Sequence, residues 1–251
     1  MEEQTHNSPL PGAPLPGGRD EAVLKLIGKQ RILSQIPEAE LRTLLRQSSV
    51  RTLRERERLF DEGDDGKSVV LVLEGYIKLS STTASGREVV HEIAGPGGVF
   101  GELAVLNNWR RSAGAEALQS SRILLIDGAQ FVRALSNNPE ALFAVIRLLS
   151  QRLKTTTEHL ADGVALAAPA RLAKAMMHLA ALHSHPVPEG LRIDFQLSQR
   201  ELGGMTGLTR ESINKHLAAW RDLGWVDLSG RSLTLLDIDA LQQLIDEHAL
   251  S

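Results

Sequence analysis

The chain has 251 residues, of which 42% are hydrophobic and 24% are charged, and its formal net charge is −3. These values are typical of a globular protein, and they exclude a uniformly basic nucleic-acid-binding surface but not a local one. The chain contains no cysteine, which excludes disulfides, thiolate metal sites, iron–sulfur clusters and cysteine nucleophiles. Its eight histidines show no metal-ligand spacing, so no metal site is expected.

The N-terminal segment is rich in proline and glycine. Residues 1–20 contain the sequence PLPGAPLPGG, which predicts a disordered tail. The segment lacks the apolar stretch of a signal peptide, and no part of the chain is apolar over a length that would cross a bilayer. We therefore expect a cytoplasmic protein with no membrane contact.

Residues 21–138 are predicted to form the first folded domain. Apolar residues at helical spacing over 20–47 indicate two short helices that are interrupted near Pro37. Over 50–127, short apolar runs alternate with glycine-containing turns. This alternation predicts a small antiparallel β roll.

Residues 139–166 are predicted to form one long helix. Two sets of residues, each repeating every seven positions and offset by four, are Leu142, Leu149, Thr156 and Gly163, and Ile146, Leu153 and Leu160. Such a repeat is typical of a coiled-coil seam and favours a homodimer. The alternative is a helix that packs along the β roll of its own chain.

Residues 167–251 are predicted to form a second domain, which begins with a helix at Pro169. Residues 183–190 are expected to form a loop. Further on, Ser198 and Glu201 have the spacing of a capping box at the start of another helix.

A helix-turn-helix follows from this capping box. Gly207 stands where the turn needs a positive φ, and Thr209 is expected to cap the second helix. A turn at Ser229 and Gly230, followed by a strand, resembles a wing, and a last amphipathic helix closes the chain.

The second helix of this motif carries side chains that suit DNA. At its N-terminal end Arg210 can pair with guanine, Glu211 can accept a hydrogen bond from cytosine, and Lys215 follows one turn later. The candidate contacts to the DNA backbone are Ser198, Arg200, Thr209 and Ser212. The alternative is a helical hairpin whose charged side chains form a solvated face.

A second candidate site lies in the sequence PGGVFGELAVLNNWRRSAGAEA. Gly101 would let backbone N–H groups approach an anion, and Arg111 could hold a phosphate, with help from Ser112 and Ala113. Glu102 would repel a phosphate, so it suits a ribose hydroxyl. A structural Glu102–Arg111 ion pair is the alternative, and spacing alone does not separate the two.

The order of these elements resembles the CRP/FNR family of bacterial transcription regulators, its cyclic-AMP-receptor type in particular, over residues 21–236. The motif FGEL…RRSA is similar to the phosphate-binding cassette of that family, with matches at Gly101, Glu102, Leu103, Arg111, Ser112 and Ala113. The resemblance implies that Arg111 and Ser112 bind a cyclic phosphate and that Glu102 binds the ribose 2′-hydroxyl.

Two further segments carry the resemblance. Thr156 and Thr157 match the positions that read adenine in the receptor type, and TRESINK is similar to the family sequence SRETVGR, with Lys215 replacing an arginine. Ala167 stands where the receptor has an aspartate that caps the next helix.

The resemblance implies an α+β protein: a cyclic-nucleotide-binding β roll, a dimerisation helix and a winged helix-turn-helix. It also implies a homodimeric regulator without enzymatic activity that binds pseudo-palindromic DNA and RNA polymerase. Cyclic AMP is the favoured ligand, with cyclic GMP and cyclic di-GMP left open. An alternative of a different class is a cyclic-nucleotide-gated interaction module of an enzyme or transport complex.

Overall fold

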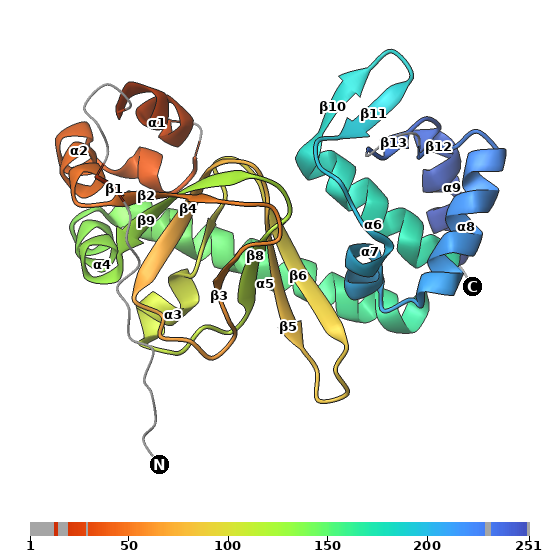
Figure 1. The fold of residues 1–251 in the computed structure, drawn as a ribbon, viewed down its shortest axis with the longest axis horizontal. Coiled ribbons are helices and arrows are strands. Elements are labelled where there is room, and N and C mark those ends of the chain that lie inside the picture. Colours follow the sequence, from red (N-terminus) through yellow and green to blue (C-terminus); the bar gives the residue numbers. More distant parts are fainter. Residues whose placement is uncertain (1–12, 15–19, 29, 229–231, 250–251) are drawn as a thin grey trace.

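The computed structural model describes residues 13–14, 20–28, 30–228 and 232–249. A β roll and a smaller, mainly helical domain lie at the two ends of the molecule, and the long helix α5 passes behind the β roll toward the second domain (Figure 1). This arrangement confirms the predicted α+β class.

Two short helices and a short strand precede the β roll. As predicted, two helices are present, α1 (Asp20–Ile27) and α2 (Glu38–Arg46), and α2 begins directly after Pro37. A 3₁₀ turn at Leu33–Gln35, which was not predicted, lies between them. The prediction of a tail without structure over 1–20 is wrong at two points: α1 includes Asp20, and β1 (Ala13–Pro14) pairs with β2 (Ser49–Leu53). β1 is the edge of its sheet, where a proline without an N–H group is tolerated.

The β roll consists of two antiparallel sheets. One has the order β1-β2-β9-β4-β7 and the other the order β3-β8-β5-β6. The remaining strands are β3 (Arg58–Phe60), β4 (Ser68–Glu74), β5 (Ile77–Thr82), β6 (Glu88–Ala94), β7 (Val99–Phe100), β8 (Gly114–Ala117) and β9 (Ser121–Asp127). Two helices, α3 (Glu102–Asn107) and α4 (Gly128–Asn137), complete the domain.

Strand β6 contains a bulge. Ser80 of β5 pairs with Val90, whereas Leu79 pairs with Glu92, so one residue of β6 has no partner. A bulge of this kind changes the face to which the neighbouring residues point. As a result Val90 and Ile93, three residues apart, both enter the hydrophobic cluster shared with the second domain.

Helix α5 (Pro139–Ala165) has a buried and an exposed part. Its buried residues, Ala141, Ala144 and Val145, lie in the first two turns and pack against the β roll. Further along, Leu153 and Leu160 are each 69% exposed in the single chain. Apolar packing on the β roll therefore accounts for the part of this helix up to Leu149, and not for the exposed leucines beyond it.

The second domain surrounds α6 (Ala168–His183). Its other helices are α7 (Gln199–Thr206), α8 (Arg210–Asp222) and α9 (Ile238–Ala249), and its strands are β10 (Ser184–Val187), β11 (Gly190–Ile193), β12 (Val226–Asp227) and β13 (Thr234–Leu235). The pairing of β12 with β13 agrees with the predicted wing, although Ser229 and Gly230 lie outside the described residues.

The loop expected over 183–190 is a wrong prediction. His183 ends α6, and the following residues form an antiparallel hairpin of β10 and β11. Pro186 suggested a loop, but it lies in β10, which is an edge strand. An edge position tolerates proline because its N–H is not needed for pairing.

Candidate nucleotide and DNA interfaces

The first site is built around the start of α3. Gly101 precedes this helix with a φ of 84°, a left-handed conformation that favours glycine. A Cβ atom there would also lie 2.3 Å from Arg111 Nη1. Glycine at this position therefore lets the arginine side chain reach the backbone of the β roll.

Arg111 is buried, with 5% of its surface exposed. Its Nη2 donates to the carbonyl oxygen of Ser68 at 2.8 Å and its Nη1 to that of Gly101 at 3.2 Å. The guanidinium carbon lies 4.1 Å from the centre of the Phe60 ring. Burial lowers the pKa of Arg111 to about 10, against the opposing effect of Glu102 and Asp64. The side chain therefore remains a cation at neutral pH.

Glu102 pairs with a residue that the sequence did not single out. Arg152 Nη1 lies 2.5 Å from Glu102 Oε1, and Arg152 Nη2 lies 2.8 Å from Glu92 Oε2. Burial would lower the pKa of Arg152, but Glu102 and Glu92 raise it above its usual value. Among the residues described here Glu102 and Arg111 form no ion pair, so that alternative is wrong. Arg152 precedes Thr156 by one helical turn, and this spacing is the signal in the sequence that could have identified Arg152 as a residue of the site.

Three buried polar atoms at this site have no hydrogen-bond partner within the described part of the chain: Glu102 Oε2, Arg111 Nε and Arg152 Nε. Buried polar atoms in folded proteins are almost always hydrogen-bonded. One acceptor and two donors here would match a ligand that offers both a hydroxyl group and anionic oxygens. A ribose phosphate has both, so these residues fit a cyclic nucleotide.

The other predicted ligand residues lie on α3, on the segment before β8 and on α5. Leu103 is half-buried in α3, Ser112 is exposed and Ala113 is half-buried. On α5, Thr156 and Thr157 are exposed in the single chain. The hydroxyl of Thr157 donates to the carbonyl of Leu153 at 2.9 Å, a common bond for threonine within a helix.

The second site is the helix-turn-helix of α7 and α8. Ser198 and Glu201 form the predicted capping box, Gly207 has a φ of 70°, and Thr209 accepts a hydrogen bond from the backbone N–H of Ser212. These three local features follow the sequence prediction. They fix the start of both helices and the turn between them.

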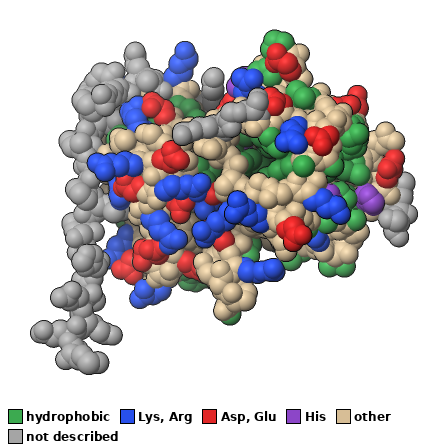
Figure 2. All heavy atoms as spheres, turned by 45° about the vertical axis from the view of Figure 1, so that its right-hand side comes forward, with side chains coloured by type: hydrophobic (Ala, Val, Ile, Leu, Met, Phe, Trp, Pro, Cys, Tyr) green, Lys and Arg blue, Asp and Glu red, His purple; other side chains and the backbone are tan. Residues whose placement is uncertain are grey.

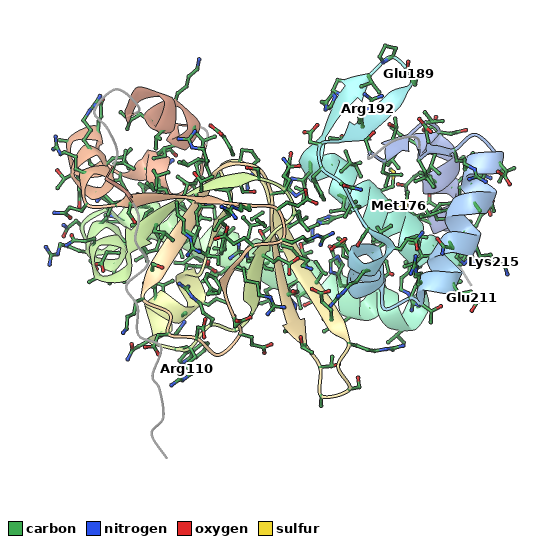
Figure 3. The ribbon with its side chains drawn as sticks, in the orientation of Figure 1. Arg110, Met176, Glu189, Arg192, Glu211 and Lys215 are labelled. Carbon is green, nitrogen blue, oxygen red and sulfur yellow. The ribbon has the colours of Figure 1, made fainter. Side chains whose placement is uncertain are left out.

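The predicted reading face of α8 is open. Arg210, Glu211 and Lys215 are exposed, whereas Ser212 is half-buried. Figure 3 shows Glu211 and Lys215 on the side of α8 that points away from the β roll. Basic and acidic side chains are interspersed over the face seen in Figure 2, in agreement with the small net charge.

Arg200 was predicted to contact a DNA phosphate. In the structure its Nε lies 2.9 Å from Glu88 Oε2 of the β roll, although the side chain remains 77% exposed. Arg200 therefore lies at the interface between the two domains, in addition to its predicted contact with DNA.

Two other features are absent from the described residues. No helix within the described ranges is both long and apolar enough to cross a membrane. The same residues contain no group of three or more acidic or histidine side chains placed to hold a metal ion.

Two family models match the chain. The cyclic nucleotide-binding domain matches residues 50–138, and the Crp-like helix-turn-helix domain matches residues 170–244. The first range contains the cassette around Gly101 and Arg111. The second contains the capping box, both helices and the wing.

Individual relatives agree with these matches. The CRP-like cAMP-activated global transcriptional regulator of Mycobacterium tuberculosis is 30% identical over 183 residues, which cover 73% of this chain and 82% of the relative. FixK2 from Bradyrhizobium japonicum has the same fold, with a TM-score of 0.69 at 20% identity over 78% of this chain and 96% of that one. The c-di-GMP responsive regulator CLP of Xanthomonas campestris has a TM-score of 0.66 at 22% identity, over 79% and 99% of the two chains.

Proposed function

The chain belongs to the CRP/FNR family of transcription regulators, and from this premise we propose that it is a homodimer whose binding to double-stranded DNA is controlled by cyclic AMP. The observation that carries the nucleotide proposal is the set of unpartnered polar atoms on Glu102, Arg111 and Arg152. The relative in Mycobacterium tuberculosis is named as cAMP-activated, which favours this nucleotide over cyclic GMP and cyclic di-GMP.

In this proposal the phosphate lies against Arg111 and the backbone at Gly101, with Ser112 and Ala113 at its edge. The ribose hydroxyl donates to Glu102, whose other oxygen is held by Arg152. A charged group in such a shielded position forms stronger hydrogen bonds than one in water. Leu103 would line the site from α3.

The base would lie against α5 at Thr156 and Thr157. A threonine hydroxyl can accept from the amino group of adenine or donate to the carbonyl of guanine, so these residues leave the choice of purine to affinity measurements. Because α5 also carries the exposed leucines of the seam, a ligand bound there would favour one arrangement of two such helices over another.

The DNA part of the proposal places α8 in the major groove. Arg210, Glu211 and Lys215 would contact bases, and Ser198, Arg200, Thr209 and Ser212 would contact the backbone. Two copies related by a two-fold axis would read a pseudo-palindrome with half-sites about 34 Å apart. We further propose that the DNA-bound dimer contacts RNA polymerase.

Calorimetry with cyclic AMP, cyclic GMP and cyclic di-GMP on one preparation tests which nucleotide the protein binds. Measurement of DNA affinity at several salt concentrations tests whether it binds DNA. We expect tightest binding of cyclic AMP and a steep fall of DNA affinity with salt, because phosphate contacts release counterions. Nucleotide binding without any DNA binding would instead favour a gated protein-interaction module.

Alanine substitution at Thr156 and Thr157 is expected to change the ratio of cyclic AMP to cyclic GMP affinity. The reason is the loss of the hydroxyl groups proposed to face the base, each worth about 0.5–1.5 kcal/mol. Calorimetry gives the ratio, and the sedimentation profile shows whether the oligomeric state is retained. An unchanged ratio in both variants would place the base elsewhere.

The variant Glu211→Ala is expected to relax base preference at one position of each half-site by about 1–3 kcal/mol, because a carboxylate that accepts from cytosine is lost. Selection from random duplexes, with and without nucleotide, measures this preference. Arg200→Ala serves as the comparison, since a backbone contact should weaken all sequences alike. Selection of no palindrome by the wild type would contradict the helix-turn-helix proposal.

A further inference from the structure

The two domains are packed together by apolar side chains. One hydrophobic cluster contains Tyr76, Val90, Ile93 and Leu118 of the β roll together with Leu172, Met176, Leu202 and other residues of the second domain. Helix α7 comes particularly close to β6. A Cβ atom on Gly204 would lie 2.7 Å from Val90 Cγ2 and 3.3 Å from the carbonyl oxygen of Glu88.

Beside this apolar contact lies a cluster of three cations and three carboxylates: Arg56, Lys78 and Arg200 with Glu88, Glu116 and Glu201. Its centre is Lys78, whose side chain is 3% exposed and whose Nζ lies 2.7 Å from Glu88 Oε1. Because the charges balance, a lysine and a glutamate can be buried together there.

Three ion pairs of this cluster cross between the domains, of which the longest joins Lys78 Nζ to Glu201 Oε1 at 3.6 Å. Arg56 Nη1 lies 2.7 Å from Glu201 Oε1, and Arg200 Nε lies 2.9 Å from Glu88 Oε2. Glu201 has no exposed side-chain surface. It is also the N3 residue of α7, which forms the capping box together with Ser198. The first turn of the helix-turn-helix is therefore bonded directly to the β roll.

Glu201 is charged at neutral pH. Burial would raise its pKa, but hydrogen bonds from Ser198 and Arg56 lower the pKa to about 2. The pair with Arg56 is thus a true ion pair. Such a pair adds little net stability, because the cost of removing both charges from water offsets their attraction.

Strand β6 connects this cluster to the nucleotide site. Glu88, at its beginning, binds Arg200 and Lys78, whereas Glu92 binds Arg152, the partner of Glu102. The bulge between them places Glu92 on the face of the strand opposite to Val90 and Ile93. One strand therefore contacts α5 on one side and α7 on the other.

We propose that the ion cluster of Arg56, Lys78, Arg200, Glu88, Glu116 and Glu201 positions the second domain on β6 in the orientation that binds DNA. The docked arrangement leaves Glu211 and Lys215 open to solvent on the far side of α8 (Figure 3). This inference rests on the proposed function, since it assigns these residues a positioning role in DNA binding.

A reversible crosslink tests the inference. The distance from a Gly204 Cβ atom to Val90 Cγ2 is close to the roughly 3 Å that separates the Cβ atom of one cysteine from the sulfur of the other in a disulfide. Because the chain has no cysteine, the double variant Val90→Cys/Gly204→Cys would form a single defined bond. We expect the affinity of the oxidised protein for the selected duplex to lie within about threefold of that of the reduced, cyclic-AMP-saturated protein. The crosslink would hold the two domains in the arrangement proposed to bind DNA, so the fraction of DNA-competent protein would not change.

Loosening the cluster gives the complementary test. Arg56 has a φ of 64°, which asparagine tolerates, so Arg56→Asn shortens the side chain without straining the backbone. We expect DNA affinity to fall about tenfold at saturating cyclic AMP, as the docked fraction falls, with nucleotide affinity unchanged. The matched control is Arg122→Asn, which removes the same charge from a residue whose ion pair with Glu74 lies within the β roll and outside the cluster.

Rescue separates positioning from a general loss of structure. In the Arg56→Asn background, oxidation of the cysteine pair should restore DNA affinity. The inference is overturned if the oxidised protein loses DNA binding, if the cysteines do not crosslink, or if Arg56→Asn behaves like Arg122→Asn. If the reduced protein binds no duplex with any of the three nucleotides, the proposed function itself has failed.

Discussion

Nucleotide affinity is expected to fall about 10- to 150-fold in Arg111→Leu, because a charge-assisted hydrogen bond to phosphate is worth about 1.5–3 kcal/mol. The same variant leaves the carbonyl groups of Ser68 and Gly101 without their donor, so a lower melting temperature should accompany the loss. Calorimetry with cyclic AMP measures the first effect and thermal unfolding the second.

The adjacent residue provides a matched control. Arg110 is 76% exposed on the side chain and lies at the lower edge of the β roll in Figure 3. Arg110→Leu removes the same charge one position away and should retain nucleotide affinity within about twofold, as expected for a surface substitution. Equal affinities of Arg110→Leu, Arg111→Leu and the wild type would refute the phosphate assignment.

The double variant Leu153→Glu/Leu160→Glu is expected to be monomeric and to lose more than a hundredfold in affinity for a palindromic duplex. Both leucines are 69% exposed in the single chain, so their replacement should change the stability of the protomer by less than about 1 kcal/mol. In the dimer each buried leucine would contribute about 1.5–3 kcal/mol. Analytical ultracentrifugation and DNA titration measure the two effects.

Leu182 of α6 offers the comparison, because it is 60% exposed but lies outside the heptad repeat. Leu182→Glu should remain dimeric and bind DNA normally. A dimeric Leu153→Glu/Leu160→Glu protein would show that the seam on α5 is not the interface.

Local signals in the sequence were sufficient for most of the fold. The capping box at Ser198 and Glu201, the positive φ of Gly207 and the length of α5 all depend on neighbours within a few residues. The turns of the β roll also follow from local glycines. Each of these features is decided by backbone geometry and hydrogen bonds within one or two turns of chain.

Contacts between distant parts of the chain were not predictable in this way. Arg152 lies 50 positions from Glu102, and Arg56 lies 145 positions from Glu201. Neither pairing leaves a periodic pattern, since an arginine on a helix or in a turn is most often solvated. The prediction of a loop around Pro186 failed for a different reason. A proline is compatible with a strand only when that strand is at an edge, and a position at the edge of a sheet is not visible in the local sequence.

The unpaired residue in β6 limits where this chain can change in length. Adding one residue to β5 between Leu79 and Ser80 would give His91 a partner and remove the bulge, so that Val90 and Ile93 would point to opposite faces of the strand. Residues added at the turn around Gly86, beyond the last pair of Thr82 with Glu88, would leave both strands in register. During divergence, insertions should therefore accumulate at the tip of this hairpin, and Leu79 and Ser80 should stay adjacent.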